Sequence, residues 1–187
     1  GAWAEDSELA PGIRDCFGTG TPHSRFVLLH AMPKNPFVGR SEPHPVLLVP
    51  GAGDNAERAF GFMSWELIAL GFDVYAVTFA HPHGDNFQHA ELFAKVIAEI
   101  SRRHGDRKVD VVAHSMGGIA LRILLSHDGT VDWGAHQDAR GAAYAAAGTP
   151  YQGRVRRAVF LGTPQRGVDT SYRWPNGNYT RVLDRPT

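Results

Sequence analysis

The 187-residue sequence contains a single cysteine, Cys16, and no apolar run long enough to span a bilayer. One thiol cannot form the paired-cysteine motifs of zinc or redox sites, so sites built on those motifs are excluded. Lys and Arg together number 19, as do Asp and Glu, so the formal net charge is zero. This balance gives no electrostatic reason to expect binding to nucleic acid or to an anionic membrane. The contents of hydrophobic residues (43%) and charged residues (20%) are those of a globular protein.

The amino-terminal stretch GAWAEDSELAPG lacks the charged and apolar regions of a secretory signal. The sequence therefore belongs either to a cytoplasmic protein or to one from which a signal has been removed. The missing initiator methionine favours the second reading, so we expect a secreted or extracellular protein, and the cytoplasm stays open. In an oxidising compartment we expect Cys16 to pair with a cysteine elsewhere, whereas in the cytosol it would be a free thiol.

Continuous apolar runs alternate with amphipathic segments along much of the sequence. Such runs are typical of strands that are buried on both faces, and the amphipathic segments have helical spacing. The expected strands are 25–31, 45–50, 73–79, 108–114 and 155–162, and the expected helices are 56–71, 87–104 and 116–126. Strands and helices that alternate in this way predict an α/β fold, a mostly parallel sheet with helices on both faces.

The length predicts a single domain over residues 1–187. Within it, residues 1–23 are rich in Gly and Pro and are expected to be irregular. Residues 127–153 form an unusually long connection, which we interpret as an insertion that carries an extra helix or a flap. Residues 163–187 show no sustained period and are interpreted as a loop, or the start of a lid, on the face where parallel sheets bind ligands.

The stretch VDVVAHSMGGIALRILLS, residues 109–126, places Ser115 between an expected strand and an expected helix. Ala113 to Gly117 approximate the G-x-S-x-G pattern of a nucleophile on a sharp strand-to-helix turn, with Ala in place of the first Gly. The turn needs small neighbours because strand and helix backbones approach closely, and Gly117 and Gly118 meet that need. The alternative is that Ser115 is a plain helix cap, because Ser often begins helices.

A second small-residue turn, Gly51-Ala52-Gly53, follows the strand expected at 45–50. An acyl-transfer enzyme needs two N–H donors directed at the oxygen that becomes negatively charged. The N–H of Met116, which follows the serine, and the N–H of Ala52 are the best candidates. The alternative is that Gly51 to Gly53 form an ordinary tight turn.

Three stretches in this order, VLLVPGAG, VDVVAHSMGG and RAVFLGTPQRG, resemble the lipase and esterase branch of the α/β-hydrolase superfamily. The resemblance covers about residues 44–167. It implies hydrolysis of carboxylic esters through an acyl-enzyme and without a cofactor. It also implies that Ser115 is the nucleophile and that Ala52 and Met116 supply the oxyanion N–H groups.

The acid and the histidine of a catalytic triad are expected after the serine in this fold. Only two histidines follow Ser115, and neither is well placed. His127 lies at the far end of the expected helix, about 18 Å away at 1.5 Å per residue. His136 lies in the connection before the last expected strand. Asp169 follows that strand and is a candidate acid, although a plain loop aspartate is the alternative.

The sequence therefore looks like the amino-terminal part of a hydrolase. We expect the precursor to be cut in an exposed loop near residue 187, because exposed loop tips are where proteolytic nicking concentrates. A second chain, the carboxyl-terminal fragment of the same precursor, would then supply the Asp or Glu and the His. A disulfide through Cys16 could join the two chains in an oxidising compartment.

His81 and His83 follow the strand expected at 73–79, and we consider them for the substrate mouth. An H-x-H pair can bind metal, but no third ligand is evident, so no metal site is predicted. Three functions stay open: a lipase or esterase, an acyltransferase or amidase with the same nucleophile, and a catalytically inactive hydrolase fold that serves as a binding module. The lack of a suitable histidine is the best argument for the third.

Overall fold

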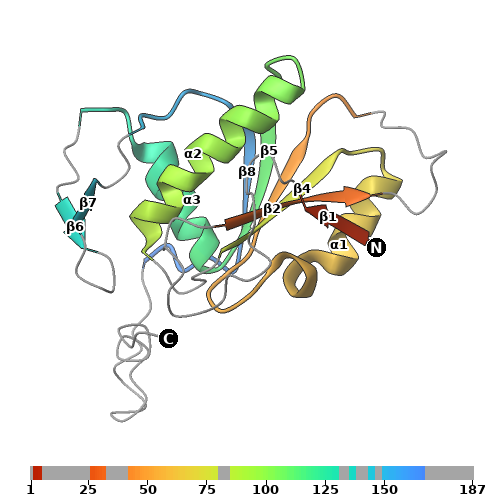
Figure 1. The fold of residues 1–187 in the computed structure, drawn as a ribbon, viewed down its shortest axis with the longest axis horizontal. Helices are drawn as coiled ribbons and strands as arrows, with labels where there is room; N and C mark the ends of the chain where they lie inside the picture. Colours follow the sequence, from red (N-terminus) through yellow and green to blue (C-terminus); the bar gives the residue numbers. More distant parts are fainter. Residues whose placement is uncertain are drawn as a thin grey trace, which may run out of the picture.

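The computed structural model describes residues 2–5, 26–32, 42–79, 85–130, 135–137, 143–145 and 149–166. Within these ranges the main sheet has six strands in the order β1-β2-β4-β3-β5-β8 (Figure 1). The neighbours β4-β3, β3-β5 and β5-β8 pair in parallel, whereas β2 pairs antiparallel with both β1 and β4. The strands are β1 (Ala2–Glu5), β2 (Phe26–Met32), β3 (Val46–Val49), β4 (Val74–Phe79), β5 (Val109–His114) and β8 (Val155–Leu161).

Three helices cover the two faces of this sheet (Figure 1). Helix α1 (Ala56–Ala69) packs on one face, where Phe60 and Ile68 meet Leu48 and Ala76. Helices α2 (Asn86–Arg103) and α3 (Met116–Ser126) pack side by side on the other face. The predicted class, a mostly parallel sheet with helices on both faces, is therefore confirmed.

The burial of the central strands explains their sequences. All four residues of β3 and all six of β4 are buried, as expected when helices cover both faces of a parallel sheet. Capping side chains set the starts of two helices. Asn55 accepts from the N–H of Arg58 at the start of α1, and Asp85 accepts from the N–H groups of Phe87 and Gln88 at the start of α2.

One expectation about an irregular segment is wrong. The prediction that residues 1–23 are irregular fails at Ala2–Glu5, which form β1 and pair with β2. Four residues are too short for a periodic signal, so pairing with β2 decides the structure. In the described part of residues 127–153, strands β6 (Ala135–Gln137) and β7 (Ala143–Ala145) form an antiparallel pair, and the insertion with an extra helix or a flap stays a prediction.

None of the described helices combines the length and hydropathy that crossing a membrane requires.

Two phenylalanines on different helices test which surfaces form the core. Phe93 on α2 is fully buried, whereas Phe62 on α1 is 81% exposed. We expect Phe93→Ala to lower the free energy of unfolding by about 3–5 kcal/mol. We expect Phe62→Ala to change it by less than about 0.5 kcal/mol, because the ring has few contacts to lose. Urea denaturation measures both changes, and equal losses in the two variants would contradict this packing.

Candidate active site

Ser115 occupies the one-residue turn between β5, which ends at His114, and α3, which begins at Met116. Its backbone has φ 49° and ψ −122°, a region that residues other than glycine rarely adopt. Such a conformation costs about 1–3 kcal/mol and persists only when surrounding contacts enforce it. Here the N–H of Ser115 donates to Leu161 O at 2.9 Å, and Ser115 O accepts from the N–H of Gly118 at 3.0 Å.

The Ser115 side chain does not cap α3, although the residue stands at the N-cap position. A capping serine normally has an extended backbone, and its hydroxyl accepts from an N–H of the first helical turn. Ser115 has a positive φ, and its side chain makes no such bond. The plain-cap alternative therefore does not describe this residue, and its hydroxyl is not committed to the helix.

Glycines around Ser115 allow three backbones to meet. A Cβ atom at Gly117 would overlap Pro50 O and lie 2.6 Å from Val49 Cγ1, at the end of β3. A Cβ atom at Gly51 would lie 2.9 Å from Ser115 Cβ, so the loop after β3 touches the serine directly. The structure thus brings the Gly51-Ala52-Gly53 turn and Ser115 together, as the sequence predicted.

The turn that contains Ala52 is held from several sides. The N–H of Asp54 donates to Gly51 O at 3.3 Å, which places Ala52 at the second position of a β-turn and leaves its N–H outside the turn's own bond. Arg58 on α1 donates to Gly53 O at 3.0 Å and to the carboxylate of Asp54 at 3.1 Å. These bonds fix the loop relative to α1, and Gly51 in the same loop touches Ser115.

Met116 provides a second N–H at the same place. It is the first residue of α3, and the first N–H groups of a helix have no acceptor within the helix. The amino-terminal end of a helix also carries a partial positive charge, which favours a negatively charged oxygen nearby. Ala52, in the turn after β3, and Met116, at the start of α3, therefore stay the two candidate donors.

The segment after β8 closes the third side of this turn. The sequence predicted a loop on this face from residue 163, but it gave no role to Thr163 or Gln165. A Cβ atom at Gly118 would overlap Thr163 Oγ1 and lie 2.8 Å from Thr163 Cγ2. Arg122 on α3 donates to both the backbone oxygen and the side-chain oxygen of Gln165, at 3.0 and 2.8 Å. The stretch LGTPQRG was the available signal, but its contacts with α3 are tertiary and have no local pattern.

Other predicted residues lie apart from Ser115 or outside the described residues. His127 follows the carboxyl-terminal end of α3, so it lies at the end of the helix away from Ser115, as expected. Its side chain is buried there. His81, His83, Asp169 and Cys16 lie outside the described residues, and His136 is described only as part of the β6 backbone.

No described carboxylate or imidazole makes a hydrogen bond with the Ser115 hydroxyl. In the same described ranges, no group of three or more His, Cys, Asp or Glu side chains is arranged to hold a metal ion.

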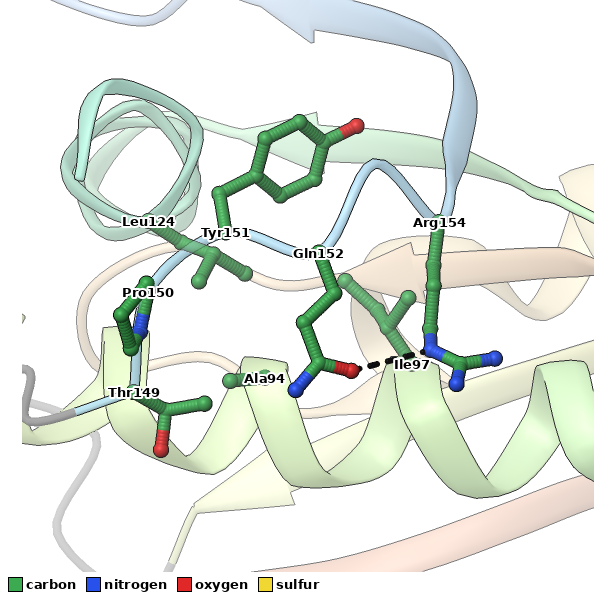
Figure 2. A pocket seen from close by; sticks show the side chains of 8 residues that line it. All are labelled: Ala94, Ile97, Leu124, Thr149, Pro150, Tyr151, Gln152 and Arg154. Carbon is green, nitrogen blue, oxygen red and sulfur yellow. Dashed lines mark hydrogen bonds between the residues drawn. The ribbon is translucent and has the colours of Figure 1, made fainter. Parts of the chain in front are cut away.

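A small hollow between α2, α3 and the segment before β8 is a different feature (Figure 2). Arg154 O, at its rim, accepts from the N–H of Val109, so the hollow lies at the amino ends of β5 and β8. Ser115 lies at the opposite, carboxyl end of β5, so the hollow does not belong to the candidate site. Its lining residues are Ala94, Ile97, Leu124, Thr149, Pro150, Tyr151, Gln152 and Arg154.

The chain matches the sequence model of one protein family, and its structure is similar to solved structures. Residues 46–187 match the sequence model of a family described as the alpha/beta hydrolase family. The structure is similar to a Bacillus licheniformis lipase, BlEst2, in its mature form, with a TM-score of 0.58 and 21% identity over 88% of this chain. This chain spans 58% of the length of that mature lipase. The propeptide form of the same lipase matches with a TM-score of 0.51 and 22% identity, over 78% of this chain and 27% of that one.

Two glycines test the close approach at the turn. We expect Gly117→Ala to lower the free energy of unfolding by about 1–3 kcal/mol, because the added methyl group meets the backbone of Pro50. The control is Gly61→Ala in the middle of α1, where nothing lies within 4 Å of the new atom. That change should raise stability by about 0.5–1 kcal/mol. Chemical denaturation of both variants measures the difference, and a Gly117→Ala protein as stable as the parent would refute the contact.

Proposed function

Because the chain belongs to the α/β-hydrolase family, we propose that it is a serine hydrolase that cleaves carboxylic esters through an acyl-enzyme on Ser115. The resemblance drawn from the motifs is confirmed at the level of this family, since the matched residues 46–187 include all three stretches. The main support for the proposed chemistry is the Ser115 turn, where an uncapped hydroxyl stands on a strained backbone at the start of α3. Strain at such a position is typical of functional sites.

The proposed reaction has two steps. In the first, a base removes the proton from Ser115 Oγ as this oxygen attacks the ester carbonyl carbon, and the alcohol leaves with that proton. In the second, water attacks the acyl-enzyme, releases the carboxylic acid and returns the proton to Ser115. The N–H groups of Ala52 and Met116 stabilise the oxyanion in both steps, and each such donor contributes about 3–4 kcal/mol in enzymes of this kind.

We infer that the base and its acid come from a second polypeptide, the carboxyl-terminal part of the same precursor. Two observations support this inference. No described imidazole or carboxylate makes a hydrogen bond with the Ser115 hydroxyl, and the chain spans only 58% of the mature lipase that it resembles. Asp169 stays a candidate acid, His81 and His83 stay candidates for the substrate mouth, and Cys16 stays a candidate for a disulfide between the chains.

Two other functions are alternatives to ester hydrolysis. An acyltransferase or amidase would use the same serine, with another acyl acceptor or an amide substrate in place of an ester. A catalytically inactive binding module would have no need of the strained Ser115 backbone, so the geometry favours an enzyme over that alternative.

Hydrolysis of p-nitrophenyl esters of graded chain length tests the proposal, with the chain co-expressed with the remainder of its precursor. We expect Ser115→Ala to lower kcat by about 10³-fold or more, because the nucleophile is removed. The control is Ser126→Ala at the other end of α3, where the hydroxyl only donates to Ile123 O. This control should stay within about twofold of the parent. Full turnover by Ser115→Ala would rule out this nucleophile, and full turnover by the 187-residue chain alone would rule out the second polypeptide.

A further inference from the structure

Arg58 stands in the first turn of α1, and its side chain is 68% exposed. Its guanidinium nevertheless makes two hydrogen bonds to the loop between β3 and α1. Nε donates to Asp54 Oδ1 at 3.1 Å, and Nη2 donates to Gly53 O at 3.0 Å. An exposed arginine that is held at two points of one loop can fix the conformation of that loop.

The backbone of Arg58 is itself held, so its side chain reaches back from a fixed position. The N–H of Arg58 donates to Oδ1 of the capping residue Asn55 at 3.0 Å. The N–H of Ala56 donates to Thr78 Oγ1 on β4, also at 3.0 Å. The start of α1 is therefore anchored to the sheet, and the bond from Arg58 to Gly53 joins the loop to that anchor.

The oxygen that Arg58 binds belongs to the peptide group that closes the turn. The peptide between Gly53 and Asp54 donates its N–H to Gly51 O at 3.3 Å. Such N–H···O bonds are usually about 2.9–3.0 Å long, so this turn bond is a weak one. The guanidinium binds the opposite end of the same peptide, and bonds at the two ends of a peptide strengthen each other. Arg58 therefore supports the turn at the group whose own bond is long.

The conformation of Gly53 makes this support necessary. Its φ of 68° is typical of the third residue of a type II turn. Glycine reaches this region without strain, but it also leaves the region easily because it has no side chain. Gly51 in the same turn touches Ser115, so a change of the turn would move the Ala52 N–H relative to the serine.

Arg58 also balances a negative charge in the turn. Asp54 comes two residues after Ala52, and its side chain is only 25% exposed. A carboxylate at this place opposes a second negative charge beside the Ala52 N–H, and the repulsion grows where water is excluded. The guanidinium lies against this carboxylate, so the two opposite charges offset each other before an oxyanion forms.

We propose that Arg58 is a positioning residue of the candidate active site. It holds the peptide between Gly53 and Asp54 so that the Ala52 N–H is directed at the oxyanion, and it neutralises the Asp54 carboxylate. This inference deepens the proposed function and rests on it for its catalytic consequence. An exposed i, i+4 ion pair adds little to stability, so we expect the effect of Arg58 in the rate and not in the fold.

Steady-state kinetics of Arg58→Gln tests the inference, with the chain co-expressed with the remainder of its precursor. We expect kcat for p-nitrophenyl esters to fall about tenfold while KM stays within about twofold, because the oxyanion exists only in the transition state. Asp54→Asn removes the uncompensated charge, so the double variant should be about threefold faster than Arg58→Gln. An unchanged kcat in Arg58→Gln, or a loss confined to KM, would overturn the inference. A double variant no faster than Arg58→Gln would refute the charge balance.

Arg102→Gln is the matched control. The Arg102 side chain is 67% exposed, and it donates two hydrogen bonds to Glu99, at 2.8 and 2.7 Å. Helix α2 ends shortly before β5 begins, so Arg102 lies at the edge of the sheet opposite to Ser115. We expect its kcat to stay within about twofold of the parent, and both variants to unfold at the same urea concentration. A tenfold loss of kcat in both variants would contradict a specific role of Arg58.

Amide exchange separates this inference from the proposed function. We expect the N–H of Asp54 to exchange at least about threefold faster in Arg58→Gln, with the paired N–H groups of β4 unchanged. Unchanged exchange at Asp54 would overturn the inference. Faster exchange in an assembly without ester hydrolysis would refute the proposed chemistry but support the hold of Arg58 on the turn. Hydrolysis that is lost in Ser115→Ala and unchanged in Arg58→Gln would support the chemistry and overturn the inference.

Discussion

The positive-φ backbone of Ser115 is the constraint on which the rest of this end of the molecule depends. A serine reaches this conformation only if the chain reverses from strand to helix in one residue. That reversal requires the end of β3 to lie against Gly117 and the loop after β8 to lie against Gly118. The cost of about 1–3 kcal/mol is offset by the packing of the strands and helix that enforce the turn. The hydroxyl is then presented at the carboxyl edge of the sheet, beside two candidate N–H donors.

The parts of the fold that sequence predicts best are those with a strong local cause. The runs that became β3, β4 and β5 are apolar because helices cover both faces of the sheet, and the start of α1 follows its capping residue Asn55. Strand β1 and the β6–β7 pair escaped prediction because each strand is only three or four residues long and depends on a partner. Their formation is decided by tertiary pairing, which overrides local preference.

The candidate site likewise has features that the sequence predicts from local patterns and features that depend on tertiary contacts. The Ser115 turn was predictable because the close approach of backbones demands small residues at fixed offsets from the serine. Two other contacts of the site were not predictable, because each joins residues more than forty positions apart. They are the contact of Thr163 with Gly118 and the hydrogen bonds from Arg122 to Gln165. Likewise, the sequence offered a nucleophile but no suitable histidine.

The role of Ser115 is the central claim, and mapping a covalent adduct tests it most directly. The assembled protein is treated with a fluorophosphonate, digested with trypsin and analysed by mass spectrometry. Cleavage after Lys108 and Arg122 gives a peptide whose single serine is Ser115. The account predicts a phosphonyl group on that peptide and none when the protein is first denatured. An adduct on a different serine, or no adduct on the native assembly, would contradict it.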